Sequence, residues 1–256
     1  MKIMYATLGL LLLLLLSCVK SDDPDSVYKG MSAKQIFDSA EKALADKSYG
    51  DASKRFEGLD AMYPFSPYSE RALRDLVYTY YQQDDYISAS ATASRYIHLY
   101  PRSQHVDYVY YMKGLADFEQ TRGAFAKFFP MDISYRDPGT QEEAYHDFET
   151  LLRLYPKSAY AGDAHQRMVY LRNLFAKQEL NVAEFYMTRK MYVAAASRAS
   201  GLVKNYQEAP QTERALEIMV ESNRALGLKE AAEDALRVLQ NTYPNSRALK
   251  RLSHTG

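Results

Sequence analysis

Residues 49–64 have the sequence YGDASKRFEGLDAMYP, which predicts one amphipathic helix that ends at a proline. Ala52, Phe56 and Leu59 stand at positions i, i+4 and i+7, so they share one apolar face. The small side chain of Ala52 allows a second helix to approach this face closely. The helix is expected to end just before Pro64, because proline lacks an N–H group and disfavours the α conformation at the preceding residue.

The same arrangement recurs along the chain. A Tyr-Pro dipeptide occurs four times, and an alanine, here called the pivot alanine, stands twelve residues before each proline. A constant offset between a small residue and a helix end is typical of one structural unit used repeatedly. A fifth, degenerate copy keeps Tyr206 but has Gln207 in place of the proline. The copies are Ala52 to Pro64, Ala89 to Pro101, Ala144 to Pro156, Ala195 to Gln207 and Ala232 to Pro244.

An earlier helix precedes each pivot alanine. In four of the five copies a small or β-branched residue stands twelve positions before the pivot, at Ala40, Val77, Ala183 and Val220. Each unit is therefore predicted to be a hairpin of two helices. The offsets resemble the tetratricopeptide repeat, so we expect an all-α fold, a helical-hairpin solenoid of about five tetratricopeptide repeats. The low glycine content (11) and the low proline content (9) agree with this fold class.

Two departures from a 37-residue spacing locate extra segments. Successive pivot alanines are 37, 55, 51 and 37 residues apart. In the third unit the excess is predicted to form a loop insertion over 123–140, which contains two prolines and two glycines. In the fourth unit the excess lengthens the first helix, which is expected to extend from Tyr160 to Arg189. The expected organisation is repeats 1–3 over 33–157 and repeats 4–5 with the tail over 158–256.

The N-terminus predicts export. A basic start is followed by an apolar run from Leu8 to Leu16 and then by Cys18, as in the lipobox of bacterial lipoproteins. Residues 1–17 are therefore expected to be a lipoprotein signal peptide. Residues 18–32 would form a lipidated N-terminus and polar tether, with N-acyl and S-diacylglycerol groups on Cys18. The alternative is an ordinary signal peptide that is cut elsewhere and leaves a free thiol.

Two further features bear on where the chain resides. Cys18 is the only cysteine, so an exported chain forms no internal disulfide. Val19 is not the aspartate that retains many lipoproteins in the inner membrane. We therefore expect a lipid anchor in the outer membrane of a Gram-negative bacterium, on the periplasmic face.

Composition argues against several classes of function. The chain has 32 basic and 32 acidic residues, a balance that disfavours nucleic-acid binding driven by charge. The five histidines form no His-Glu-Xaa-Xaa-His arrangement, and there is no glycine-rich phosphate loop or nucleophile elbow. We therefore expect a protein that is not an enzyme and that has no metal and no cofactor beyond the covalent lipid.

Four segments resemble those of the BamD family, whose members are lipoproteins of the β-barrel assembly machinery. The resemblance extends over nearly the whole mature chain, from about Ala33 to the last repeat, with both extra segments in the expected places. The segments are YPFSPYSERALRDLVYTYY from Tyr63, RYIHLYPRSQHVDYVYYMKGL from Arg95, YRDP at 135–138 and VAEFYMTRKMYVAAASR at 182–198.

The resemblance implies a scaffold that helps to fold and insert outer-membrane β-barrel proteins. In this family the C-terminal repeats dock on a POTRA domain of BamA, the barrel-forming insertase. The N-terminal repeats are thought to receive the C-terminal signal of the unfolded substrate. Some members also hold the lipoproteins BamC and BamE.

A substrate-peptide groove is predicted on the first helices of repeats 2 and 3. In a tetratricopeptide hairpin the second, fifth, ninth and twelfth positions of the first helix line the groove. Arginine binds carboxylates bidentately and tyrosine offers a flat apolar contact, so this set suits a peptide that ends in an aromatic residue and a carboxylate. The alternative is that the arginines are solvated or paired with Glu70 and Asp75 and that the tyrosines pack between helices. The groove positions are Arg71, Arg74, Tyr78, Tyr81, Tyr108 and Tyr111.

The BamA-binding surface is predicted on the second helix of repeat 4. There Arg198 and Lys204 interrupt a run of small and apolar residues, AAASRASGLVKNY. Small residues let another backbone come close, and an arginine among them can pair with a carboxylate of a POTRA domain. The resemblance favours Arg198 for this contact, and the alternative is that it is a solvent-exposed charge.

Two other functions remain open from the sequence. A tetratricopeptide lipoprotein that scaffolds periplasmic cell-wall enzymes would share the lipobox and the repeats. It would not need the YPFSPYS segment or the YRDP insertion. A lytic transglycosylase also contains a helical superhelix, but it needs a catalytic glutamate in a separate compact lobe, and no segment is left over to form one.

Overall fold

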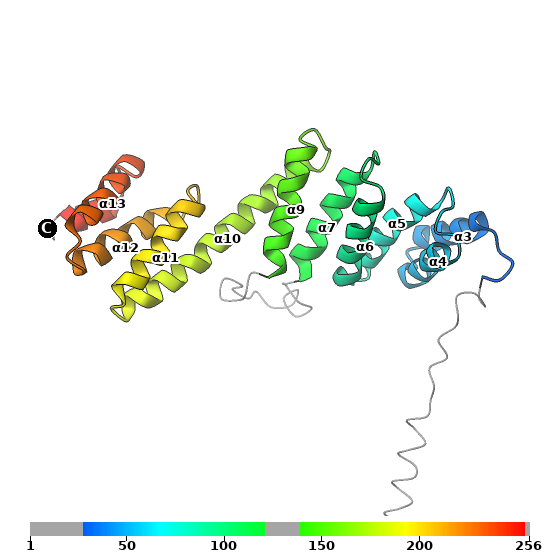
Figure 1. The fold of residues 1–256 in the computed structure, drawn as a ribbon, viewed down its shortest axis with the longest axis horizontal. Coiled ribbons are helices and arrows are strands. Elements are labelled where there is room, and N and C mark those ends of the chain that lie inside the picture. The colour runs from blue at the N-terminus through cyan, green and yellow to red at the C-terminus, as the bar shows by residue number, and fades with distance from the viewer. Residues whose placement is uncertain (1–27, 121–138, 254–256) are drawn as a thin grey trace, which may run out of the picture. The chain divides into compact units, whose positions relative to one another are not determined.

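The described part of the chain is helical throughout. The computed structural model describes residues 28–120 and 139–253, and these ranges contain helices and no β-strand (Figure 1). The prediction of an all-α fold is confirmed. The helices are α3 (Ala33–Ala45), α4 (Tyr49–Met62), α5 (Ser69–Gln82), α6 (Tyr86–Leu99), α7 (Val106–Gln120), α9 (Thr140–Leu154), α10 (Ala161–Thr188), α11 (Tyr192–Asn205), α12 (Thr212–Ala225), α13 (Lys229–Thr242) and α14 (Arg247–Ser253).

These helices form two compact units that divide between Gln83 and Asp84. In the first unit α3 packs on α4 and α4 packs on α5. In the second unit each helix from α6 to α13 packs on the next one along the chain, as the predicted hairpin stack requires. The boundary between the compact units does not test the expected organisation into repeats 1–3 and repeats 4–5. That organisation stays a prediction.

The pivot residues lie in the core, as predicted. Alanine at this position lets the two helices of a hairpin approach closely, so any larger side chain would hold them apart. Gly114 takes the matching place on α7, and a Cβ atom there would lie 2.7 Å from the Phe148 ring. The exposed fraction is 0% for Ala52, Ala89, Ala144 and Ala195 and 3% for Ala232, and it is 0% for Ala40, Val77, Ala183 and Val220 on the first helices.

The second helix of every hairpin ends in the same way, at a tyrosine. The five tyrosines have φ between −127° and −135° and ψ between 48° and 62°. Each N–H donates to the carbonyl four residues back, and each carbonyl accepts from the N–H three residues on. Tyr206 adopts this geometry although Gln207 follows it, so the proline reinforces the helix end but is not required for it. The tyrosines are Tyr63, Tyr100, Tyr155, Tyr206 and Tyr243.

Restoring the missing proline is expected to stabilise the protein. Gln207 is exposed, and its backbone lies in the turn where the other copies have proline. Gln207→Pro should therefore raise the free energy of unfolding by about 0.4–1 kcal/mol, because proline restricts the unfolded chain more than the folded one. Urea titration measures this gain. The reverse change Pro244→Gln is the matched control and should lose a similar amount; a loss of stability in Gln207→Pro would contradict the equivalence of the two turns.

The turn inside each regular hairpin also has one geometry. A residue in the left-handed region stands five positions before the pivot alanine, at Lys47, Asp84, Lys190 and Gly227, with φ between 58° and 73°. Only the last copy has the glycine that this region favours. The turn was therefore indicated by the sequence at Gly227 but not at the other three positions.

The predicted long helix is confirmed. Helix α10 has 28 residues, begins after Tyr160 and ends before Arg189, and it packs on both α9 and α11. Most of the predicted insertion over 123–140 lies outside the described residues. Its last residue, Thr140, is the first residue of α9 rather than part of a loop.

The N-terminal segment is described only from Tyr28. Residues 28–31 were expected to belong to the tether, but they pack on the first unit. The Tyr63 hydroxyl donates to the Met31 carbonyl at 2.8 Å, and the Tyr28 ring lies against Gly58, where it leaves no room for a Cβ atom. The signal peptide, Cys18 and residues 19–27 of the tether lie outside the described residues, and Ser32, its last residue, caps the start of α3.

Candidate functional site

Helix α5 carries the first part of the predicted groove. Arg71 forms ion pairs with Glu41 of α3 and, at 3.4 Å, with Asp75. Its guanidinium also lies 5.2 Å from the centre of the Phe37 ring. The Arg74 Nε donates to Asp75 Oδ1 at 3.0 Å. Both arginines therefore pair with Asp75. The alternative to the groove hypothesis predicted this intramolecular pairing.

The carboxylates of this cluster are not fully satisfied. Glu41 Oε1 is buried and has no hydrogen-bond partner among the described residues. Burial raises the pKa of Glu41, and the neighbouring Asp75 carboxyl raises it further, while Arg71 and Arg74 oppose the shift. The cluster thus holds two guanidinium groups and two carboxyl groups, and one carboxylate oxygen, Glu41 Oε1, is enclosed by the protein.

The tyrosines of α5 are partly buried. The Tyr78 ring meets the Tyr49 ring edge-on at 6.4 Å, and burial raises the pKa of Tyr78. Tyr81 is also half-buried. Packing against α4 therefore occupies part of the Tyr78 surface that the groove hypothesis assigns to a peptide.

The tyrosines of α7 pack against the start of α10. The Tyr111 ring stacks on Tyr160 at 4.9 Å, and the Tyr108 ring lies 5.5 Å from Tyr160. The Tyr111 hydroxyl donates to Asp163 Oδ2 at 2.7 Å. Burial and this hydrogen bond raise the pKa of Tyr111 to about 12. Tyr111 therefore stabilises the junction between two repeats.

The six groove residues thus divide between the two compact units. Four of them lie on α5 in the first unit, and Tyr108 and Tyr111 lie on α7 in the second. Each group is brought together within its own unit. A continuous groove that joins them stays a prediction.

The two residues predicted to contact the insertase lie on α11. Arg198 is about half exposed, and its Nη1 lies 3.2 Å from both carboxylate oxygens of Glu179 on α10. Lys204 is exposed in the last turn of the same helix. Arg198 is therefore held in place by one carboxylate while half of its side chain stays open to solvent.

An ion pair joins the first helices of two successive repeats, and it was not predicted from the sequence. Arg71 of α5 pairs with Glu41 of α3, and Arg214 of α12 pairs with Glu184 of α10 at 3.3 Å. In both cases the arginine follows the glutamate by 30 residues and takes the second position of its tetratricopeptide repeat, while the glutamate takes the ninth position of the preceding repeat. This shared offset was the available signal.

The described ranges contain neither a metal-binding cluster nor a membrane-spanning helix. Residues 28–120 and 139–253 contain no group of three or more His, Cys, Asp or Glu side chains placed to hold a metal ion. Within the same ranges, no helix has the length and apolar character needed to cross a membrane.

Comparison with solved structures gives weak likenesses, of which one is an example. The structure described as "Functional Characterization of Pseudomonas Aeruginosa pilF" aligns with a TM-score of 0.37 and 16% identity, over 89% of this chain and 84% of that one. A likeness at this level carries no conclusion about function.

Comparison of sequences gives much stronger matches. Residues 29–239 match the family YfiO, described as "Outer membrane lipoprotein". The "Outer membrane protein assembly factor BamD" of Vibrio cholerae is 37% identical over 236 residues, which cover 92% of this chain and 98% of the relative. The protein of the same name from Xylella fastidiosa strain Temecula1 is 35% identical, over 86% of this chain and 75% of the relative. The chain therefore belongs to the YfiO family of outer membrane lipoproteins, which includes the BamD assembly factors.

Proposed function

We propose that this protein is a non-catalytic scaffold of the β-barrel assembly complex, which helps to fold and insert β-barrel proteins into the outer membrane. The observation that carries the proposal is the similarity to an outer membrane protein assembly factor along 92% of the chain. The repeat architecture supports it, because stacked helical hairpins present long surfaces for other polypeptides. The names of the relatives describe assembly factors rather than enzymes.

The proposed location is the periplasmic face of the outer membrane. The family description supports an outer membrane lipoprotein. The lipid would be attached to Cys18, which follows the apolar run of the signal peptide. Residues 19–27 would then connect the lipid to the first unit, which the chain enters at Tyr28.

The cluster on α5 is proposed to receive the C-terminal signal of a substrate. A peptide carboxylate would pair with Arg71 or Arg74 in competition with Asp75. The proposal thus rests on the two guanidinium groups.

Charge reversal at Arg74 tests this part of the proposal. Arg74→Glu should weaken binding of a C-terminal peptide of a β-barrel protein at least tenfold, since a charge-assisted hydrogen bond contributes about 1.5–3 kcal/mol. Fluorescence titration with labelled peptide measures the change. Arg74→Lys is the matched variant, with an intermediate loss expected because lysine keeps the charge without the bidentate geometry. An unchanged affinity in Arg74→Glu would exclude this site.

Arg198 is proposed to contact a POTRA domain of BamA. Arg198→Glu should abolish copurification with BamA, because the exposed half of the side chain would then repel an acidic partner. The variant also breaks the pair with Glu179, so Glu179→Gln is the control that breaks the pair but keeps the arginine. Retention of BamA by Arg198→Glu would contradict the proposal. Loss of BamA in both variants would assign the effect to the ion pair.

Crosslinked pulldown from outer membranes tests the function as a whole. The expected partners are BamA and unfolded β-barrel substrates, together with BamC or BamE where the bacterium has them. Recovery of cell-wall synthases or hydrolases without BamA would contradict the proposal and favour the cell-wall scaffold.

A further inference from the structure

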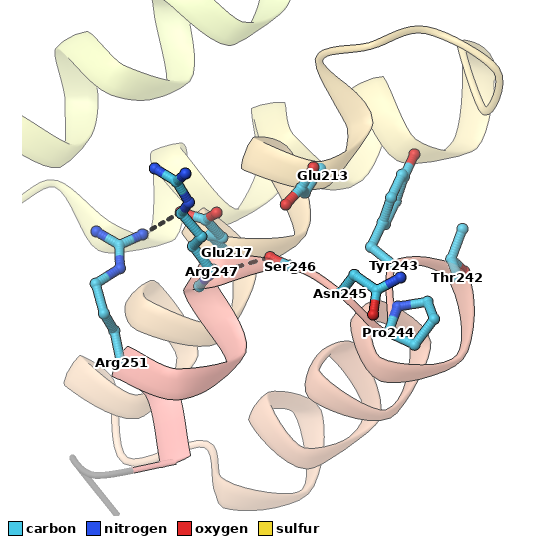
Figure 2. Close-up of a pocket in the computed structure, with 10 residues that line it drawn as sticks. Glu213, Glu217, Thr242, Tyr243, Pro244, Asn245, Ser246, Arg247 and Arg251 are labelled. Carbon is cyan, nitrogen blue, oxygen red and sulfur yellow. Dashed lines mark hydrogen bonds and ion pairs between the residues drawn. The ribbon is translucent and has the colours of Figure 1, made fainter.

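The turn that follows each helix-ending tyrosine has the same form in all five hairpins. The N–H of the third residue after the tyrosine donates to the tyrosine carbonyl at 2.9 to 3.1 Å. The second residue after the tyrosine is exposed in every copy. Figure 2 shows the last copy, where Asn245 follows Tyr243 and Pro244 and lines a pocket of mainly polar and charged residues. The five exposed residues are Phe65, Arg102, Lys157, Glu208 and Asn245.

Phe65 is the exception among these five residues. The other four copies carry a charged or amide side chain, as a turn that faces water normally does. Phe65 is apolar and 98% exposed, the largest exposed fraction of any large hydrophobic residue in the ranges that the structure describes. Two nearby prolines, Pro64 and Pro67, are exposed as well. Where the repeat predicts a polar residue, the first unit therefore presents an apolar tip.

The turn that carries Phe65 is held in one conformation. The Ser69 hydroxyl donates to the Tyr63 carbonyl at 2.8 Å, and the Ser66 and Ser69 hydroxyls are hydrogen-bonded to each other at 2.9 Å. The two prolines have a fixed φ angle, which restricts the turn further. Phe65 therefore cannot reach the core of the unit without breaking these bonds. A ring that is already held in this way loses little conformational freedom when it binds.

The chain enters the first unit next to this turn. The Tyr63 hydroxyl donates to the Met31 carbonyl at 2.8 Å, so the start of the described chain and the Phe65 turn lie at the same end of the unit. Ten residue steps separate Tyr28 from Cys18, and they can span at most about 33–36 Å. A lipid attached to Cys18 would thus keep this end of the unit within that distance of the membrane surface.

A lipid surface suits Phe65 better than a second protein does. A partner protein would need a pocket shaped for the ring, whereas lipids make room for a protruding ring without a preformed pocket. Apolar side chains that project from a protein bind at the boundary between lipid headgroups and acyl chains. One ring is too weak to hold a free protein there. In an anchored chain the same step is intramolecular, and a high local concentration compensates for the weak contact.

We propose that Phe65 inserts into the lipid surface that holds the Cys18 anchor. The ring is a second point of attachment for the first unit. The tether alone lets this unit rotate, whereas the tether and the ring together fix which end of it faces the membrane. The inference rests on the lipid attachment proposed above, and it does not depend on the peptide site or on the contact with BamA.

A tryptophan in place of Phe65 tests the insertion. The chain has no tryptophan, so Phe65→Trp introduces a single reporter and keeps an aromatic ring at an exposed position. The lipidated chain is reconstituted into phosphatidylcholine vesicles with bromine on the upper part of the acyl chains. Ala45→Trp is the matched control, because Ala45 is exposed at the other end of α3, about 20 Å along the helix. Bromine should quench Phe65→Trp at least about threefold more strongly than Ala45→Trp.

A second comparison removes the ring instead of replacing it. Cys18 is the only cysteine, so a fluorophore on Ala45→Cys labels one place in the lipidated chain. On vesicles, adding Phe65→Ser should shorten the rotational correlation time of this label about twofold, because one of two attachment points is lost. Leu99→Ser is the matched control, since it removes an exposed leucine from the second unit and should leave the correlation time unchanged.

Flotation of the vesicles separates failure of the inference from failure of the anchor. Protein that does not float with the vesicles would contradict lipid attachment and overturn the inference with it. Protein that floats, but in which bromine quenches Phe65→Trp and Ala45→Trp equally, would overturn the inference alone and leave the proposed location intact. A shift of the Phe65→Trp emission to shorter wavelength without quenching by bromine would also overturn it, because protein rather than lipid would then cover the ring.

Discussion

Lys113→Met is expected to lower the free energy of unfolding by about 3–5 kcal/mol at pH 8, the cost of breaking a buried ion pair by removing one partner. The Lys113 ammonium lies 2.9 Å from Asp117 Oδ2 on its own helix and 2.7 Å from Asp147 Oδ2 on α9. Asp117 is fully buried, and the Asp147 side chain is 14% exposed. Without the lysine, two carboxylates face each other inside the hairpin. Guanidinium titration measures the loss.

The size of this loss should depend on pH. Burial raises the pKa of Asp147 from its ordinary 3.8 to about 7, and the neighbouring Asp117 adds to the shift, although the Lys113 ammonium opposes it. Between these two values the folded state binds more protons than the unfolded state. The stability of the wild type should therefore fall as the pH rises from about 4 to about 7. Lys113→Met should lose less at pH 5 than at pH 8, because a proton on Asp147 removes one of the two charges.

Asp147→Asn is the matched control for both statements. An amide at this position still accepts from Lys113 and has no proton to lose, so the fall in stability between pH 5 and pH 8 should shrink by about 1–3 kcal/mol. The double variant Lys113→Met with Asp147→Asn should recover part of the loss. A pH-independent loss in Lys113→Met would contradict the raised pKa of Asp147, and the absence of any loss would show that the cluster does not stabilise the hairpin.

Gly114→Ala is expected to destabilise the protein by about 1–3 kcal/mol, in spite of the better helix propensity of alanine. The added Cβ atom would lie 2.7 to 2.9 Å from three atoms of the Phe148 ring. Phe148 is fully buried, so its ring has little room to move. Helices α7 and α9 would have to separate. Chemical denaturation of the variant measures the cost.

Gly201→Ala is the matched control for this prediction. Gly201 lies within α11, and a Cβ atom there would meet nothing within 4 Å. The same substitution should therefore stabilise the protein by up to about 1 kcal/mol through helix propensity alone. Equal effects of the two substitutions would contradict the close contact at Gly114.

Local features of the chain were predictable because they depend on neighbouring residues. The burial of Ala52 and of the other pivot alanines follows from a helical period, and helix ends follow from Tyr-Pro. The bounds of α10 followed from counting residues between repeats. The left-handed turns at Lys47 and Lys190 were not predictable, since lysine carries no sign of positive φ, and aspartate at Asp84 favours this region only weakly.

The candidate site was predictable only in part. The sequence placed Arg71 and Arg74 on one face of a helix and named Asp75 as a partner. It did not reveal Glu41, whose carboxylate comes from the preceding repeat. Tyr111 was assigned to a groove, but its ring stacks on Tyr160, which is 49 residues away in the sequence.

The sequence by itself determined the repeat, its helix ends, the extra length of α10 and the family, because each of these is encoded by short-range spacing. Only the tertiary structure decided which charges meet, as in Lys113 with Asp147. Such contacts join side chains from different helices. Their partners depend on how each helix is rotated and stacked against the next, which no local pattern specifies.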